Sequence, residues 1–128
     1  MDALVQAAVA ARRNAHAPYS NFHVGSALES VDGRIFSGCN VESASYGLTL
    51  CAERVAAFHA IAQGARHFKR IAVATGVAKP APPCGACRQV LWDLCGDIDV
   101  ILVNADGITE SFRLSELFPR PFDDSSMA

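Results

Sequence analysis

The segments CAE at residues 51–53 and PCGAC at residues 83–87 decide how this chain is expected to fold. Together they hold three cysteines and one glutamate, and each stands at the start of an apolar pattern with helical spacing. Three cysteines can fill three positions around a zinc ion while a fourth position stays open to water. Glu53 is then left free to move protons. The two segments therefore predict a catalytic zinc site held between the starts of two helices.

Both segments have the features of helix N-termini. Thr49 is the expected N-cap of the first helix, whose apolar stripe runs up to Gly64. Pro83 precedes Cys84 at the start of a second stripe, which ends at Gly96. A helix N-terminus carries partial positive charge and lowers the pKa of a nearby thiol. Two N-termini that face each other are therefore expected to form a pocket of three sulfurs.

Two other functions are compatible with the CxxC pattern at residues 84–87 alone. A thioredoxin-like redox pair should directly follow a strand and work without a third cysteine, but Pro80, Pro82 and Pro83 interrupt the chain just before it. A structural zinc knuckle needs a second CxxC or a CxxH, and the sequence contains neither. A hydrolytic zinc site explains both the third cysteine and Glu53.

Two arginines follow the cysteine segments directly. Three thiolates carry more negative charge than one zinc dication can balance, which weakens the activation of water. Arg54 follows Glu53, and Arg88 follows Cys87. Guanidinium groups beside the sulfurs would offset the excess charge, so at least one of Arg54 and Arg88 is predicted to do so. The alternative is that they are solvated surface residues.

The motifs extend over nearly the whole chain, in the order PYSNF (18–22), GCNVE (38–42), CAER (51–54), PCGACRQV (83–90), ELFP (116–119) and Phe122. In this order the chain resembles the cytidine deaminases, in particular the small homotetrameric form with three cysteine ligands. The resemblance implies an α/β fold of three α/β/α layers with a five-stranded mixed sheet. It also implies one Zn²⁺ per subunit.

The resemblance assigns site residues one by one. Cys51, Cys84 and Cys87 match the zinc ligands, Glu53 matches the proton shuttle, and Arg54 matches the residue that offsets thiolate charge. The positions that match substrate contacts are Asn40 and Glu42 for the ribose 3′-hydroxyl, Phe22 and Phe122 for the base pocket, the backbone N–H of Ala52 for the 2-oxo group, and the carbonyl of Pro82 for the leaving amine. Ala44 and Tyr46 match a stretch that meets a neighbour's site, and Phe122 matches a residue that reaches in from another subunit.

The implied reaction is zinc-dependent hydrolysis of cytidine and deoxycytidine to uridine and deoxyuridine, with release of ammonia in pyrimidine salvage. Hydroxide held by the zinc attacks C4, and one carboxylate, Glu53, can carry protons to N3 and to the leaving group. A deaminase of a pyrimidine nucleoside analogue, of the blasticidin type, shares the core motifs and stays open. A zinc-stabilised binding module leaves Glu53 without a role.

Composition restricts the partners. The formal net charge is −2 and no Lys/Arg cluster is present, so a polynucleotide substrate or other nucleic acid is not expected. No apolar run is long enough to cross a bilayer, so no membrane partner is expected. The five cysteines fit the reducing cytoplasm, where Cys39 and Cys95 would be buried small hydrophobes. Hydrophobic residues make up 51% of the chain, which suits an oligomer interface. The resemblance to the cytidine deaminases implies that this oligomer is a homotetramer with shared active sites.

Periodicity and turn residues predict the order of the elements. We expect a single domain over residues 1–128, since 128 residues suffice for one core. The expected elements are a helix at 2–15, two strands joined near 32–33, the helix of Cys51, a strand at 69–75, the helix of Cys84, a strand at 97–104, a turn at 106–107, another strand, and a short helix near 114. Strands that alternate with helices indicate a layered α/β fold with a mixed sheet.

Overall fold

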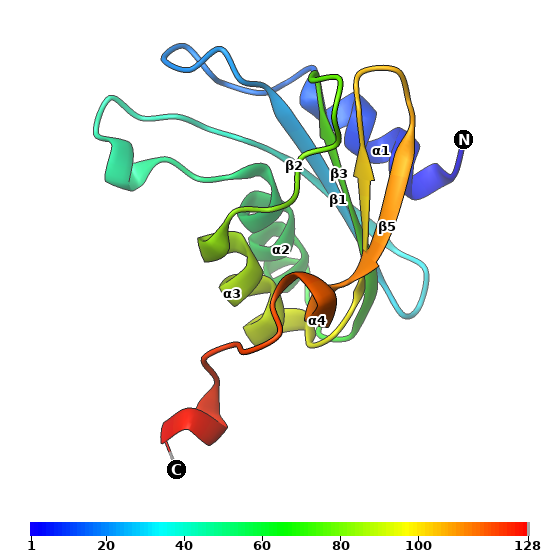
Figure 1. Ribbon diagram of the computed structural model, residues 1–128, viewed down its shortest axis with the longest axis vertical. Coiled ribbons are helices and arrows are strands. Elements are labelled where there is room, and N and C mark those ends of the chain that lie inside the picture. Colours follow the sequence, from blue (N-terminus) through cyan, green and yellow to red (C-terminus); the bar gives the residue numbers. More distant parts are fainter. Residues whose placement is uncertain (128) are drawn as a thin grey trace.

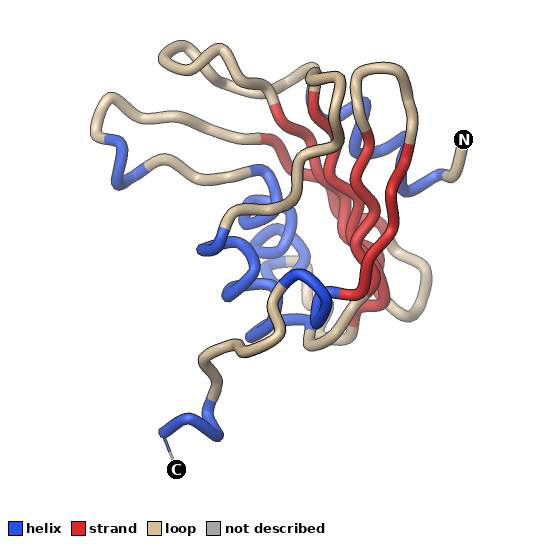
Figure 2. The backbone as a smooth tube through the Cα atoms, viewed as in Figure 1, coloured by secondary structure: helices blue, strands red, loops and turns tan. Residues whose placement is uncertain are grey.

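A mixed sheet of five strands forms the centre of the computed structural model, which describes residues 1–127 (Figures 1 and 2). The strand order is β2-β1-β3-β4-β5, with β3 and β4 parallel and the other three pairs antiparallel. The elements are α1 (Ala3–Arg12), β1 (Val24–Ser30), β2 (Ile35–Cys39), the 3₁₀ turn η1 (Tyr46–Leu48), α2 (Ala52–Ala62), β3 (Phe68–Thr75), α3 (Gly85–Cys95), β4 (Asp99–Val103), β5 (Thr109–Arg113), α4 (Leu114–Leu117) and the 3₁₀ turn η2 (Asp124–Met127). The predicted five-stranded mixed sheet is confirmed.

Helices cover both faces of the sheet, which gives the expected α/β/α layers (Figure 1). On the central strand β3, side chains alternate between two apolar clusters. Ala72 and Ala74 pack against α1, whereas Ile71 and Val73 belong to the cluster beneath α2 and α3. All four are at most 2% exposed. The face that carries α2 and α3 is therefore the one on which the cysteine segments meet.

Two glycines allow helices to lie unusually close to the sheet. A Cβ at Gly25 would lie 2.1 Å from the carbonyl oxygen of Ala8 in α1. A Cβ at Gly38 would lie 2.4 Å from the backbone nitrogen of Ala56 in α2. Since real Cβ atoms do not approach backbone this closely, neither position accepts a larger residue without moving a helix. Gly38 thus fixes the height of α2 above β2.

The helix boundaries correct two details of the sequence prediction. Thr49 is not the N-cap of α2; Cys51 is, with φ −71° and ψ 155°. The Thr49 hydroxyl instead accepts a hydrogen bond from the Ser43 N–H, and its backbone N–H closes η1. The first helix ends at Arg12 rather than at residue 15, because His16 leaves the helix to pair with the segment around Val41. None of the helices within residues 1–127 combines the length and apolar character needed to span a membrane.

Candidate active site

The N-termini of α2 and α3 bring the three predicted metal ligands together. The two helices contact each other and begin at the same end of the sheet (Figure 1). Cys51 is the N-cap of α2, Cys84 is the N-cap of α3, and Cys87 lies in the first turn of α3. The sulfur atoms of the three residues all lie within 4.8 Å of one another. Each sulfur therefore lies in the positive field of a helix N-terminus.

The spacing of the sulfurs fits a zinc ion. Tetrahedral zinc with Zn–S bonds of about 2.3 Å holds its sulfur ligands roughly 3.8 Å apart. Here Cys51 Sγ lies 3.7 Å from Cys84 Sγ, which lies 3.4 Å from Cys87 Sγ. All three cysteines are free thiols. Cys87 is buried, Cys51 is half-buried and Cys84 is exposed, so one side of the cluster is open. This is the donor set of a metal site with an accessible fourth position.

The thiols differ in acidity. The pKa of Cys51 is lowered to about 5, because Cys87 and Arg54 donate hydrogen bonds to its sulfur. The pKa of Cys87 is raised, because its thiol donates to Cys51 and is buried. Arg54 Nη2 lies 3.5 Å from Cys51 Sγ, and its pKa is raised mainly by that contact. A fixed guanidinium therefore faces the sulfur that ionises most readily, as the sequence predicted for Arg54.

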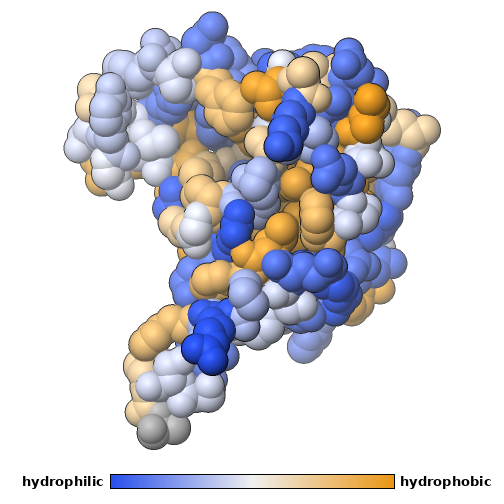
Figure 3. Space-filling view, in the orientation of Figure 1, coloured by the Kyte–Doolittle hydropathy of each residue, from blue (hydrophilic) through white to orange (hydrophobic). Residues whose placement is uncertain are grey.

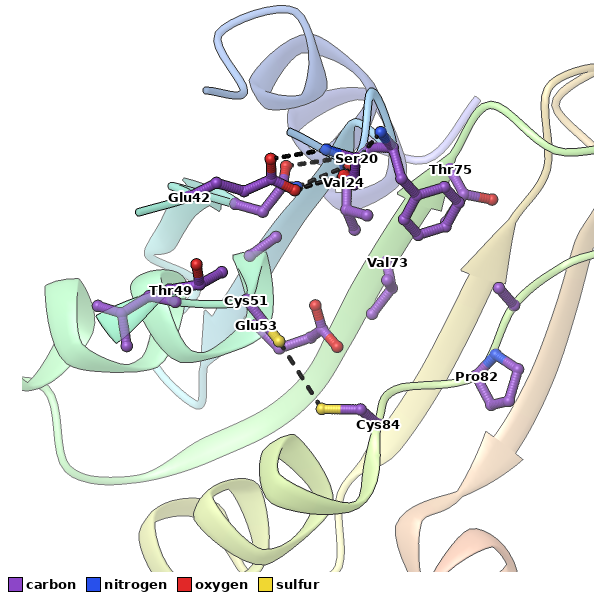
Figure 4. Close-up of a pocket in the computed structure, with 15 residues that line it drawn as sticks. Ser20, Val24, Glu42, Thr49, Cys51, Glu53, Val73, Thr75, Pro82 and Cys84 are labelled. Atoms are coloured by element: carbon purple, nitrogen blue, oxygen red, sulfur yellow. Dashed lines mark hydrogen bonds between the residues drawn. The ribbon is translucent and has the colours of Figure 1, made fainter. Parts of the chain in front are cut away.

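Glu53 is the buried acid of the site. It belongs to the first turn of α2, next to Cys51, and only 4% of the residue is exposed. Burial raises its pKa to about 7, and the nearby Cys51 sulfur adds to the effect. A carboxyl group with this pKa both takes up and releases protons near neutral pH, as general acid–base catalysis requires. Figure 4 shows its side chain extending into the cavity beside Cys51.

A cavity of about 280 Å³ joins the sulfur cluster to the edge of the molecule. Cys51, Glu53 and Cys84 line one part of the cavity, and Glu42 and Ser20 line another (Figure 4). The remaining lining is mostly apolar, with Val24 and Val73 among the wall residues. The volume lies just below the usual range for small-molecule sites, so the cavity suits a compact ligand.

Asn40 and Glu42 line the cavity, and both are hydrogen-bonded to the segment at residues 19–24. The Asn40 amide donates to the Phe22 carbonyl at 2.7 Å and accepts from the Val24 N–H at 3.0 Å. The Glu42 carboxylate accepts from the backbone N–H groups of Tyr19 and Ser20 and from the Ser20 hydroxyl. The Ser20 hydrogen bond is the main cause that lowers the pKa of Glu42.

The structure brings some predicted substrate residues to the cavity and leaves others outside it. Phe22, Asn40, Glu42, Ala52 and Pro82 line it. Ala44, Tyr46 and Phe122 do not, and they are exposed. Tyr46 and Phe122 are 76% and 60% exposed. Their two segments stand out from the body of the chain (Figure 1), and the surface between them carries both apolar and polar residues (Figure 3).

Arg88 forms its described hydrogen bonds with backbone carbonyls. Its Nε donates to the Pro83 carbonyl at 2.8 Å, and its Nη1 donates to the Leu117 carbonyl at 2.5 Å. Within residues 1–127 no cysteine sulfur is among its hydrogen-bond partners. Its hydrogen bonds go to carbonyls at the start of α3 and the end of α4, so a role of Arg88 in offsetting thiolate charge stays a prediction. In this way Arg88 ties α4 to the cysteine loop.

Sequence reasoning missed several residues that line the cavity, notably Ser20, Val73 and Thr75. Thr75 is 4% exposed, and its Oγ1 has no hydrogen-bond partner within the described residues. Strand periodicity contained the signal, because Ile71, Val73 and Thr75 alternate onto one face of β3. The sequence did not show that this face borders the cavity.

Comparison with known proteins agrees with this geometry. Residues 1–103 match a family model described as "Cytidine and deoxycytidylate deaminase zinc-binding region". A cytidine deaminase of Halalkalibacterium halodurans is 47% identical over 125 residues, which cover 97% of this chain and 95% of that protein. A cytidine deaminase of Sporosarcina psychrophila is 41% identical over 100% of this chain and 95% of its own.

Solved structures show the same arrangement. The crystal structure of cytidine deaminase from Burkholderia pseudomallei matches with a TM-score of 0.89 and 51% identity, covering 94% of this chain and 97% of that one. The structure from Mycobacterium leprae matches with a TM-score of 0.79 and 40% identity, covering 91% and 95%. Both structures therefore share the fold of this chain over nearly all of its length.

Proposed function

Because the chain belongs to the cytidine and deoxycytidylate deaminase family, we propose that it hydrolyses cytidine and deoxycytidine to uridine and deoxyuridine, with release of ammonia. One observation carries the proposal: a buried carboxyl group, Glu53, with a pKa raised to about 7, lies beside a cluster of three cysteines inside a cavity. Cys51, Cys84 and Cys87 would hold a zinc ion, which would act as a Lewis acid and make a water molecule more acidic.

Glu53 moves the protons of the reaction. It accepts a proton from the attacking water and delivers it to N3 of the pyrimidine, so that C4 becomes tetrahedral. It then takes the remaining proton from the new hydroxyl group and passes it to the amino group. The C4–N4 bond breaks, ammonia leaves, and the 4-oxo group forms. Burial raises the pKa of the Glu53 carboxyl group to about 7, so the group can take up a proton and release it again in both steps.

The other cavity residues orient the substrate. The backbone N–H of Ala52 suits the 2-oxo group, since it belongs to the free N–H groups of the first turn of α2. Pro82 lines the cavity, as Cys84 does, and its carbonyl is proposed to accept the leaving amine. Asn40 and Glu42 offer donor and acceptor groups to a sugar hydroxyl. Phe22 covers the apolar face of the base. Arg54 offsets the thiolate charge.

We propose that the substrate is a free nucleoside and that the reaction belongs to pyrimidine salvage in the cytoplasm. The whole chain would form one catalytic domain. A formal net charge of −2 opposes a polynucleotide substrate. The direct test measures zinc content together with loss of ultraviolet absorbance on cytidine, on blasticidin and on single-stranded DNA. Zinc near one equivalent with turnover of cytidine supports the proposal. Turnover of blasticidin alone replaces it with the analogue deaminase, and an inactive zinc protein removes it.

We also propose a homotetramer whose active sites are shared between subunits. Tyr46, Leu48 and Phe122 are large hydrophobic side chains that are 76%, 72% and 60% exposed, as is typical of surfaces that another protein covers. A neighbouring subunit would bury them, and Phe122 and the stretch from Ala44 to Tyr46 would then complete that neighbour's pocket. A pocket completed in this way would exclude water from the base.

Mixing two inactive variants should restore activity if the sites are shared. Glu53→Gln subunits keep an intact Phe122, and Phe122→Ala subunits keep an intact Glu53, so hybrids contain some complete pockets. A mixture of Glu53→Gln with Asn40→Ala is the control, since Glu53 and Asn40 line one cavity of the same chain and no hybrid pocket holds both. Cytidine turnover after confirmed subunit exchange is the measurement. A fully active monomer by light scattering would contradict the shared site.

A further inference from the structure

We propose that Ser20 is a positioning residue that couples Glu42 to Phe22 and so sets the place of the aromatic wall over the bound base. The proposal rests on the deaminase function proposed above and deepens it. Ser20 binds no predicted reacting group. It acts through two residues that do line the substrate cavity.

Glu42 is bound to the loop at residues 19–22. Its Oε1 accepts the backbone N–H of Tyr19 at 3.0 Å and that of Ser20 at 3.1 Å, while its Oε2 accepts the Ser20 hydroxyl. Hydrogen bonds to a charged acceptor are stronger than neutral ones. The same carboxylate that is proposed to bind the sugar therefore also fixes the loop (Figure 4).

The Ser20 hydroxyl extends the link to Phe22. It donates to Glu42 and accepts the Phe22 N–H at 3.0 Å. On the other side, the Asn40 amide donates to the Phe22 carbonyl at 2.7 Å. Side chains thus bind both the N–H and the carbonyl of Phe22. The N–H is linked through Ser20 to Glu42, and the carbonyl is bound by Asn40. Both Glu42 and Asn40 are proposed to bind the sugar.

Phe22 depends on these bonds because its own side chain is weakly anchored. It is 42% exposed, and the preceding residue, Asn21, has a left-handed backbone with φ 57°. A non-glycine residue in this conformation is strained and needs local contacts to persist. Ser20 itself is exposed, so removing its hydroxyl leaves the core unchanged. The effect of such a change should fall on the loop alone.

The test compares Ser20→Ala with Ser20→Thr, which keeps the hydroxyl, and with Ser111→Ala, an exposed serine on β5 as control. Ser20→Ala removes both hydrogen bonds of the hydroxyl and should raise KM for cytidine by roughly 5- to 30-fold, with kcat within about twofold. Ser20→Thr should restore most of KM. Hydrogen exchange of the Phe22 amide should accelerate in Ser20→Ala and stay protected in Ser20→Thr.

A double-mutant cycle separates positioning from direct substrate contact. In a Phe22→Ala background, Ser20→Ala should cause little further change in KM, because its effect passes through Phe22. An undiminished Ser20→Ala effect in that background, or an unchanged Phe22 amide, would overturn the proposal. Absence of wild-type turnover on cytidine would instead overturn the proposed function, while amide exchange would still decide whether Ser20 fixes the loop.

Discussion

Glu53→Gln should lower kcat for cytidine by about 10²- to 10⁴-fold or more, while zinc and nucleoside still bind. The amide keeps the size of the carboxyl group and its place in the first turn of α2, but it cannot carry a proton between water, N3 and the amine. Because Glu53 lies outside the group of three sulfurs that fits a metal, the metal ligands are untouched.

The measurement is steady-state turnover with zinc content determined on the same sample. Glu110→Gln, at an exposed glutamate on β5, controls for the loss of one negative charge elsewhere. The affinity for uridine should change little in Glu53→Gln, which shows that the pocket remains formed. Near-normal turnover in a zinc-replete Glu53→Gln protein would exclude Glu53 from the mechanism.

Replacing any one of Cys51, Cys84 and Cys87 with serine should weaken zinc binding by more than about 100-fold, since even outer contacts to metal ligands are worth 10- to 100-fold. Loss of one thiolate also removes a negative charge from a cluster whose sulfurs are 3.4 to 3.7 Å apart in two of its pairs. Competition with a chelator of known affinity measures the change, and turnover should fall in parallel.

Cys39→Ala and Cys95→Ala are the matched controls and should keep zinc. Burial raises the pKa of Cys95 to about 12, so this residue remains a thiol near neutral pH. It lies eight residues beyond Cys87, about 12 Å along α3. If either control variant loses the metal, the site has a fourth protein ligand and is closed, and the hydrolytic reaction would lack a position for water.

The sequence predicted the parts of the site that depend on local spacing. Cys84 and Cys87 are three residues apart at a helix start, so any helix there places both sulfurs on one face. The strand at 69–75 and the short helix near Leu114 appear within one or two residues of their predicted places. Turn residues also located the hairpin between β1 and β2. Its turn needs a positive φ, which is 92° at Gly33, and glycine adopts such a value readily.

What the sequence could not predict depends on contacts between distant segments. The partners of Arg88 are carbonyls of Pro83 and Leu117, and the second lies 29 residues away. Thr49 has the chemistry of an N-cap, but its hydroxyl binds the Ser43 N–H within a loop whose path no local pattern determines. The role of Ser20 depends on Glu42, 22 residues further along the chain. Which of several possible partners such a side chain binds depends on segments that come together only in the folded chain.

The contact between Gly38 and α2 restricts which residues can replace Gly38, although glycine takes no part in the chemistry of the site. Any side chain at Gly38 would push against the backbone of Ala52 and Ala56. Both residues belong to α2, the helix whose N-cap is Cys51. A shift of α2 outward would separate the Cys51 sulfur from those on α3. A genetic screen for lost activity should therefore recover Gly38 alongside the cysteines, although Gly38 has no functional group. Natural variation at such a position is restricted by geometry, and a strictly retained glycine among relatives would not signal a catalytic residue.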